Sequence, residues 1–109
     1  MTAATTIDRP IDLIEQARSL SIDDVWAALP ERVRANDAIM NRIQSADPKL
    51  AAVSFSDYLW EDDPNDTGRR RRSLPPEKLI PLALCLYLHQ GGKDPEDELR
   101  FWKKLEQIA

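Results

Sequence analysis

The sequence is short of cysteine, histidine and glycine, and each shortage excludes a kind of site. Cys85 is the single cysteine, so the chain can form no internal disulfide and no zinc site built from several cysteines. His89 is the single histidine, which leaves no second imidazole as a base or a metal ligand. Gly91 and Gly92 are two of only three glycines, too few for a glycine-rich phosphate loop. We therefore expect neither a metal nor a cofactor.

Long apolar runs are also absent. The most apolar segment, residues 79–88, has ten residues, whereas a helix that crosses a bilayer needs about 20. Residues 1–20 contain Asp8, Asp12 and Glu15 and lack the apolar core of a secretory signal. A single unpaired cysteine suits a reducing compartment. We therefore expect a soluble, cytoplasmic protein with no membrane partner.

The composition fits one small globular domain. A chain of 109 residues can bury a single core without disulfides, and we predict one domain over residues 1–109. The hydrophobic fraction of 42% and the charged fraction of 31% are typical of soluble domains. The net charge of −4 argues against nucleic acid as the main partner.

Helix start and stop signals recur through the first part of the chain. Residues 1–9 are predicted to be a loose lead-in, and an apolar stripe predicts a helix over residues 10–19. Ser21 and Asp24 have the spacing of a capping box. The box predicts a second helix, which should end before Pro30 because the residue before a proline is disfavoured in a helix.

Further helices are predicted up to residue 60. Apolar residues recur with a period of 3.6 from Glu31 to Ala46, which predicts one helix there. Asp47 followed by Pro48 is typical of an N-cap and a first helical turn. One of the two serines at positions 54 and 56 is expected to start another short helix.

The last part of the chain predicts a charged loop followed by a helical hairpin. Residues 61–75 are dominated by turn formers and charges. Residues 76–108 contain two helical patterns, separated by the glycine pair and by an N-cap and proline at Asp94 and Pro95. No segment alternates cleanly between apolar and polar residues, so no strand is expected. The predicted fold class is all-α, a small multi-helix bundle of about five to six helices that ends in this hairpin.

Residues 79–88 are apolar on every side of their predicted helix. Such a helix must be surrounded by protein or lipid, so it is either the centre of the core or half of an interface. If the other helices cover it fully it is core. If they do not, a partner or a second copy binds on the uncovered side.

Cys85 and His89 are four residues apart on this predicted helix, so their side chains can be neighbours. One interpretation is a nucleophilic pair, which needs a lowered thiol pKa and a third, orienting group. The favoured interpretation is structural, with Cys85 as a small core residue and His89 at the end of the helix. Carboxylates also cluster at residues 23–24, 61–63 and 96–98, but helix first turns and loop solvation account for them. We therefore expect no enzyme activity and no catalytic residues.

Four consecutive arginines form the strongest candidate binding site: Arg69, Arg70, Arg71 and Arg72. Guanidinium groups in a row bind phosphates or acidic protein surfaces. Four carboxylates just upstream neutralise residues 61–72 as a whole. A solvated linker is therefore the first interpretation of this segment, an acidic protein partner the second and nucleic acid the third.

Tryptophan offers one more candidate. Trp26, Trp60 and Trp102 each fall on the apolar side of a predicted helix, so core packing is expected for all three. Trp60 lies beside the charged loop, and tryptophan is enriched at binding hot spots. We therefore group it with the four arginines as a candidate partner-binding residue.

The sequence predicts a small helical protein–protein interaction module, an adaptor, inhibitor or assembly subunit with no catalytic site of its own. A protein partner or a homodimer is expected, because chemistry-bearing motifs are missing while one helix is apolar all round. The alternative is a nucleic-acid-associated regulator that binds through the loop of Arg69–Arg72.

Overall fold

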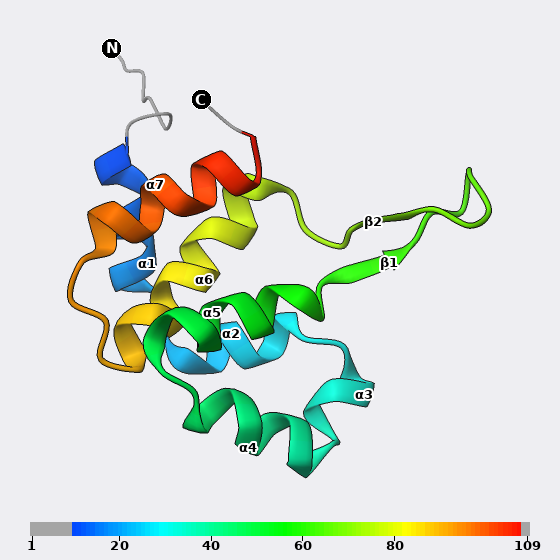
Figure 1. The fold of residues 1–109 in the computed structure, drawn as a ribbon, viewed down its shortest axis with the longest axis horizontal. Coiled ribbons are helices and arrows are strands. Elements are labelled where there is room, and N and C mark those ends of the chain that lie inside the picture. Colours follow the sequence, from blue (N-terminus) through cyan, green and yellow to red (C-terminus); the bar gives the residue numbers. More distant parts are fainter. Residues whose placement is uncertain (1–9, 108–109) are drawn as a thin grey trace.

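The computed structural model describes residues 10–107, and within them the predicted helical bundle is confirmed. The predicted lead-in over residues 1–9, and Ile108 at the end of the predicted hairpin, lie outside these residues. The described part contains seven helices, more than the five to six predicted, and two short strands (Figure 1). In chain order the elements are α1 (Pro10–Ser19), α2 (Ile22–Ala28), α3 (Glu31–Arg34), α4 (Asp37–Ser45), α5 (Pro48–Asp57), β1 (Trp60–Asp62), β2 (Arg70–Arg72), α6 (Pro76–His89) and α7 (Pro95–Leu105).

Local capping chemistry sets several helix ends where the sequence predicts them. The Ser21 hydroxyl accepts from the Asp24 N–H (3.3 Å), and the Asp24 carboxylate accepts from the Ser21 N–H (2.8 Å), which completes the capping box of α2. Helix α2 ends at Ala28, before Pro30. At the start of α5 the Asp47 carboxylate accepts from the Leu50 N–H (2.9 Å), as expected of an N-cap.

The predicted helices between residues 31 and 60 are wrong in two details. A single helix from Glu31 to Ala46 is expected, but the chain breaks at Asn36, which has an extended backbone and caps α4 by accepting from the Ile39 N–H (3.1 Å). A short polar side chain that bonds the backbone competes with helix continuation, which is the physical reason for the break. Helix α5, in contrast, runs unbroken through both serines to Asp57, so neither of them starts a new helix.

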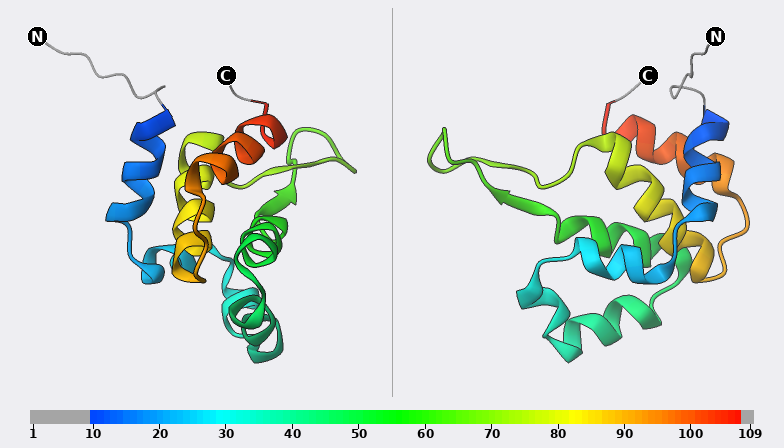
Figure 2. Two further views of the ribbon diagram at one scale, coloured as in Figure 1. Left: turned by 60° about the vertical axis from the view of Figure 1, so that its left-hand side comes forward. Right: turned by 180° about the vertical axis from the view of Figure 1, so that it is seen from behind.

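Helix α6 is the centre of the core, which decides between the two interpretations of residues 79–88. It packs against α1, α2, α5 and α7 (Figure 2). Its buried residues cover nearly the whole circumference: Leu79, Ile80, Pro81, Ala83, Leu84, Cys85 and Leu86. The all-round apolar pattern therefore reflects a helix enclosed by its own chain, and α6 is not needed as an interface.

The predicted turn between the last two helices is confirmed in atomic detail. Gly91 has a left-handed backbone (φ 99°), its N–H donates to the Leu88 carbonyl (3.0 Å), and the Gly92 N–H donates to the Tyr87 carbonyl (2.8 Å). These two bonds form a Schellman motif, which satisfies the last carbonyls of α6. A Cβ atom at Gly92 would overlap the Tyr87 ring, so both glycines are required by the turn.

The charged segment after α5 is not a loop but a β-hairpin, and the expectation of no strand is wrong. Strands β1 and β2 pair antiparallel, and the turn between them contains Gly68 with φ 90°. We call residues 60–72 the arm, because they extend away from the helices into solvent (Figures 1 and 2). Each strand has only three residues, with charges on both faces, so the alternation that reveals a strand in a sequence is missing.

Candidate functional site

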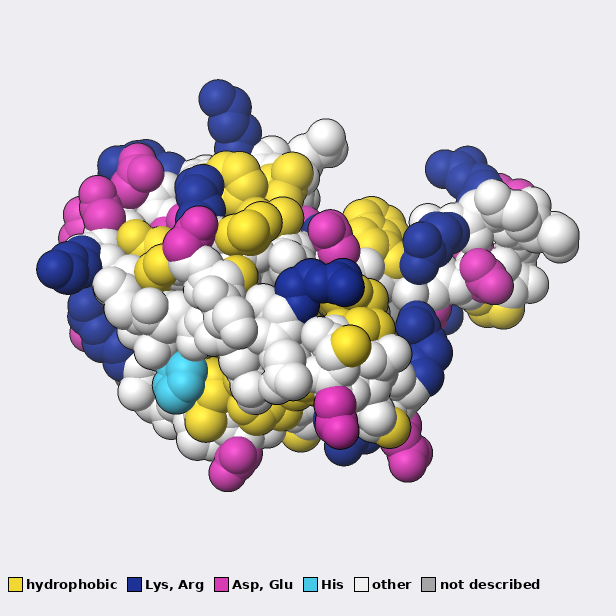
Figure 3. Space-filling view, turned by 60° about the horizontal axis from the view of Figure 1, so that its bottom comes forward, with side chains coloured by type: hydrophobic (Ala, Val, Ile, Leu, Met, Phe, Trp, Pro, Cys, Tyr) yellow, Lys and Arg dark blue, Asp and Glu magenta, His cyan; other side chains and the backbone are white. Residues whose placement is uncertain are grey.

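The arm brings together all five predicted partner-binding residues and separates their charges by strand. The cross-strand neighbours are Trp60 with Arg72, Glu61 with Arg71, and Asp62 with Arg70. Glu61 and Asp62 therefore lie on β1 and three arginines lie on β2, while Asp63, Asp66 and Arg69 belong to the turn between the strands. In the space-filling view, Lys and Arg side chains are prominent along the arm (Figure 3). The arm thus has an acidic edge and a basic edge.

Three of the four arginines are exposed and weakly held. The Arg71 Nη2 lies 2.7 Å from the Glu61 Oε2, and the Arg69 Nη1 lies 3.6 Å from the Asp66 Oδ2. Exposed ion pairs of this kind contribute about 0–1 kcal/mol. Arg70 has no carboxylate partner among residues 10–107, and its Nη2 donates to the Trp60 carbonyl (3.3 Å). These three side chains can exchange their present contacts for those of a partner at little cost.

Arg72 is different, because it fixes the arm to the helices. Its Nη2 and Nε donate to the two carboxylate oxygens of Glu106 (2.6 and 3.3 Å), just after α7. Its Nη1 donates to the Ser56 carbonyl in α5 (2.6 Å), and its guanidinium lies over the Trp60 ring at 4.2 Å. Such a fork-on-carboxylate arrangement is the strong form of this ion pair. The geometry therefore makes Arg72 a structural residue rather than a free contact residue.

The three tryptophans have different environments. Trp102 is fully buried, as core packing requires, whereas Trp26 and Trp60 are only half-buried. Trp60 lies at the base of the arm, in β1 rather than at the end of a helix, with the Arg72 guanidinium over its ring. It can support the arm and still present part of its ring to a partner.

A buried carboxylate, Glu98, was missed by sequence reasoning, which attributed the whole 96–98 cluster to the first turn of a helix. Glu98 is 2% exposed and accepts from the Trp102 Nε1–H (2.8 Å) and from the Lys49 Nζ (3.2 Å). The available signal was its position, four residues before Trp102 and next to Leu99 on the apolar face of α7. Both carboxylate oxygens have donors, so this group is structural.

The structure does not activate the Cys85 thiol. Cys85 is buried, its Sγ lies 3.8 Å from the carbonyl oxygens of Leu20 and Ser21, and His89 is exposed. Burial raises the pKa of the Cys85 thiol, and the negative charge of Asp24 raises this pKa further. A nucleophilic cysteine needs the opposite shift.

This pKa shift gives a testable prediction for Cys85. In the folded protein the thiol should react with iodoacetamide at least about tenfold more slowly than after denaturation at the same pH, because the thiolate is disfavoured and shielded. The folded-state pKa lies above that of the unfolded chain. The stability that this group contributes is therefore fully present below the pKa of an ordinary thiol and is lost as the pH rises through the raised value. A Cys85→Ser variant should lack this alkaline loss. Equal labelling rates in folded and unfolded protein would contradict the prediction.

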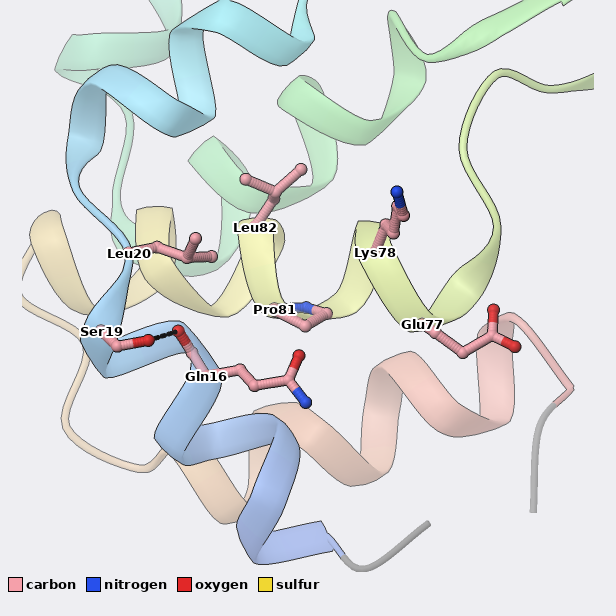
Figure 4. Close-up of a pocket in the computed structure, with 7 residues that line it drawn as sticks. All are labelled: Gln16, Ser19, Leu20, Glu77, Lys78, Pro81 and Leu82. Carbon is pink, nitrogen blue, oxygen red and sulfur yellow. Dashed lines mark hydrogen bonds between the residues drawn. The ribbon is translucent and has the colours of Figure 1, made fainter. Parts of the chain in front are cut away.

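Two shallow hollows flank the junction between α1 and α2, where the chain crosses α6. One, of about 310 Å³, lies between Gln16 and Leu20 on one side and Pro81 and Leu82 on the other (Figure 4). The second, of about 400 Å³, borders Cys85 and shares Leu20 with the first. Their charged groups lie at the exposed rim, so neither hollow combines a nucleophile with an activated base.

No three His, Cys, Asp or Glu side chains within residues 10–107 come close enough together to hold a metal ion. In the same part of the chain no helix combines the length and apolar character needed to cross a membrane. No protein-family model matches the sequence, and neither the curated proteins nor the solved structures contain a significant match to the chain.

Proposed function

We propose that the protein is a protein–protein interaction module whose contact element is the arm. One observation carries the proposal: a projecting hairpin separates its charges into an acidic edge and a basic edge and is anchored at its base by Arg72. The favoured sequence interpretation, a solvated linker, accounts less well for this arrangement. A linker needs neither a paired ladder nor an anchoring residue with several bonds to the helices.

The basic edge favours an acidic protein surface as the partner. The guanidinium groups of Arg69, Arg70 and Arg71 are exposed, and their present contacts are surface interactions within the arm, of which only that of Arg71 with Glu61 uses two donor nitrogens. Arginine binds carboxylates through a planar fork of donors, which adds geometry to charge. A charged arm also accelerates encounter with a partner of opposite sign.

Nucleic acid is the second candidate, since the same three guanidinium groups can also bind phosphates. Four carboxylates on the arm oppose it: Glu61, Asp62, Asp63 and Asp66. Between residues 61 and 71 they outnumber the three arginines. Aromatic side chains for base stacking are missing from the same stretch. An acidic protein, which can approach along the β2 edge alone, avoids most of this repulsion.

The test replaces Arg69, Arg70 and Arg71 together with alanine. We expect capture of a protein partner from nuclease-treated host extract to fall at least about tenfold, as quantitative mass spectrometry measures it. The matched control removes three exposed cations elsewhere, Arg32, Arg42 and Lys104, and thereby changes the net charge equally. The control should capture the partner as the wild type does. Equal losses in the two variants would show that net charge, not the arm, determines binding, and a loss that appears only without nuclease would favour nucleic acid.

A further inference from the structure

The ladder of the arm leaves main-chain groups unused at both edges. The Asp63 N–H donates to the Arg69 carbonyl (2.9 Å), so these two residues form a hydrogen-bonded pair. Hydrogen-bonded and non-hydrogen-bonded pairs alternate along an antiparallel ladder. The next pair, Asp62 with Arg70, is therefore non-hydrogen-bonded. The N–H and C=O of Asp62 point to the outer side of β1, and those of Arg70 point to the outer side of β2.

The two edges differ in what they offer to another strand. On the β1 side the Trp60 carbonyl already accepts from the Arg70 side chain, and the nearby side chains of Glu61 and Asp62 are negative. On the β2 side the register directs the Arg70 N–H away from β1, and no turn, loop or cap acceptor for it occurs among residues 10–107. The residues that line this edge are arginines, although the guanidinium groups of Arg70 and Arg71 at present reach across to the Trp60 carbonyl and to Glu61 on β1. The β2 edge is therefore open and lined by arginine.

We propose that the β2 edge of the arm binds an extended acidic segment of another protein as a third strand. This inference rests on the proposed function and specifies how the arm binds. Strand addition to a free edge supplies main-chain hydrogen bonds, and side chains flanking the edge select the sequence. Here the main chain of Arg70 supplies the hydrogen bonds. Arg69 and Arg71 lie on one face of the ladder and Arg70 on the other, so carboxylates on successive residues of the added strand can draw a guanidinium from its exposed contact with β1 or the turn on either face.

Charge complementarity also decides against a second copy of this chain as the occupant. A two-fold pairing of β2 with β2 of a second copy would place arginine opposite arginine, and like charges directly opposite each other are destabilising. A head-to-tail pairing of β2 with β1 of another copy would match the charges but would leave free edges that extend without closing. Charged side chains along an edge are also a known protection against indiscriminate strand pairing. The arginines therefore disfavour a basic strand and favour an acidic one.

The experiment measures binding of fluorescent peptides to the full chain by anisotropy. The acidic probe alternates glutamate with threonine, which favours extended structure. A second probe has the same sequence with every main-chain nitrogen methylated, which keeps the charge and removes the main-chain donors. Arg70→Pro removes the outward N–H of the β2 edge, and Asp62→Pro removes the equivalent N–H of the β1 edge. Because neither N–H belongs to the ladder, both prolines are compatible with an edge strand. Arg70→Thr removes the charge of Arg70 and keeps its N–H.

We expect the Glu-Thr probe to bind the Asp62→Pro variant as tightly as it binds the wild type. It should bind the Arg70→Pro variant about tenfold more weakly than the Arg70→Thr variant. Binding should also slow hydrogen exchange of the Arg70 amide in the wild type, a measurement that does not depend on whether the proline variant folds. Equal binding of the N-methylated probe, or no slowing of exchange at Arg70, overturns strand addition but leaves an arm that binds acidic partners by charge alone. A dimer that disappears in Arg70→Pro overturns the choice of occupant. If replacing Arg69, Arg70 and Arg71 with alanine leaves binding of both probes unchanged, the proposed function itself is wrong.

Discussion

Replacing Trp102 with alanine is expected to lower the free energy of unfolding by about 3–5 kcal/mol, the usual range for removing a large aromatic side chain from a core. The Trp102 side chain is fully buried and fills the space between α7 and its neighbours. Its Nε1–H is also a donor to the buried carboxylate of Glu98 (2.8 Å). The substitution therefore leaves a cavity and a carboxylate oxygen without its donor. A domain of this size has only about 5–15 kcal/mol of stability, so the substitution removes a large fraction of it.

Chemical denaturation measures this loss, and two variants on the same helix separate its causes. Trp102→Phe keeps most of the side-chain volume and removes the donor. Its loss in free energy of unfolding, about 1–3 kcal/mol, therefore reports mainly the unpaired oxygen of Glu98. Leu105→Ala truncates a side chain that is 49% exposed and should change the stability by less than about 1 kcal/mol. If Trp102→Ala were as mild as Leu105→Ala, α7 would not close the core as the structure shows.

The helices could be predicted from the sequence because their ends depend on neighbouring residues. The capping box at Ser21 and the N-cap at Asp47 act over three residues, and Pro30 acts on the residue before it. The missed break at Asn36 has the same local origin, since asparagine is a good N-cap as well as a tolerated helix residue. The apolar run of α6 could likewise be assigned to a helix. Its enclosure could not, because that depends on the positions of four other helices.

The arm could not be predicted, because its contacts join residues that are far apart along the chain. Strand pairing depends on residues about ten apart that carry no apolar alternation, so their charges suggested a loop. The role of Arg72 depends on Glu106, 34 residues away, and on the Ser56 carbonyl, 16 residues away. Four consecutive arginines look equivalent in a sequence. Only the fold distinguishes Arg72, which is held against the helices, from the three that remain exposed.

Replacing Arg72 with alanine is expected to lower the free energy of unfolding by about 2 kcal/mol and to release the arm. The side chains of Arg72 and Glu106 are only 15% and 8% exposed, so the substitution leaves a largely buried carboxylate without its partner. It also removes the donor to the Ser56 carbonyl and the cation over the Trp60 ring. Amide hydrogen exchange should become faster at the base of the arm while that of α6 changes only in proportion to the global stability.

The control for Arg72→Ala is Arg71→Ala, which removes the same charge from the neighbouring position. The Arg71–Glu61 pair is about half exposed, so this variant should change the stability by about 0–1 kcal/mol and leave exchange at the base of the arm unchanged. Arg72→Lys should not restore the anchor, because one ammonium cannot provide the guanidinium fork that spans Glu106 and Ser56.

If the arm acts in binding, Arg72→Ala should weaken partner capture without removing any contact atom, since a mobile arm must be ordered again on binding. Full capture by a variant with a released arm would show that the arm's direction does not matter. The anchoring of Arg72 would then serve stability alone.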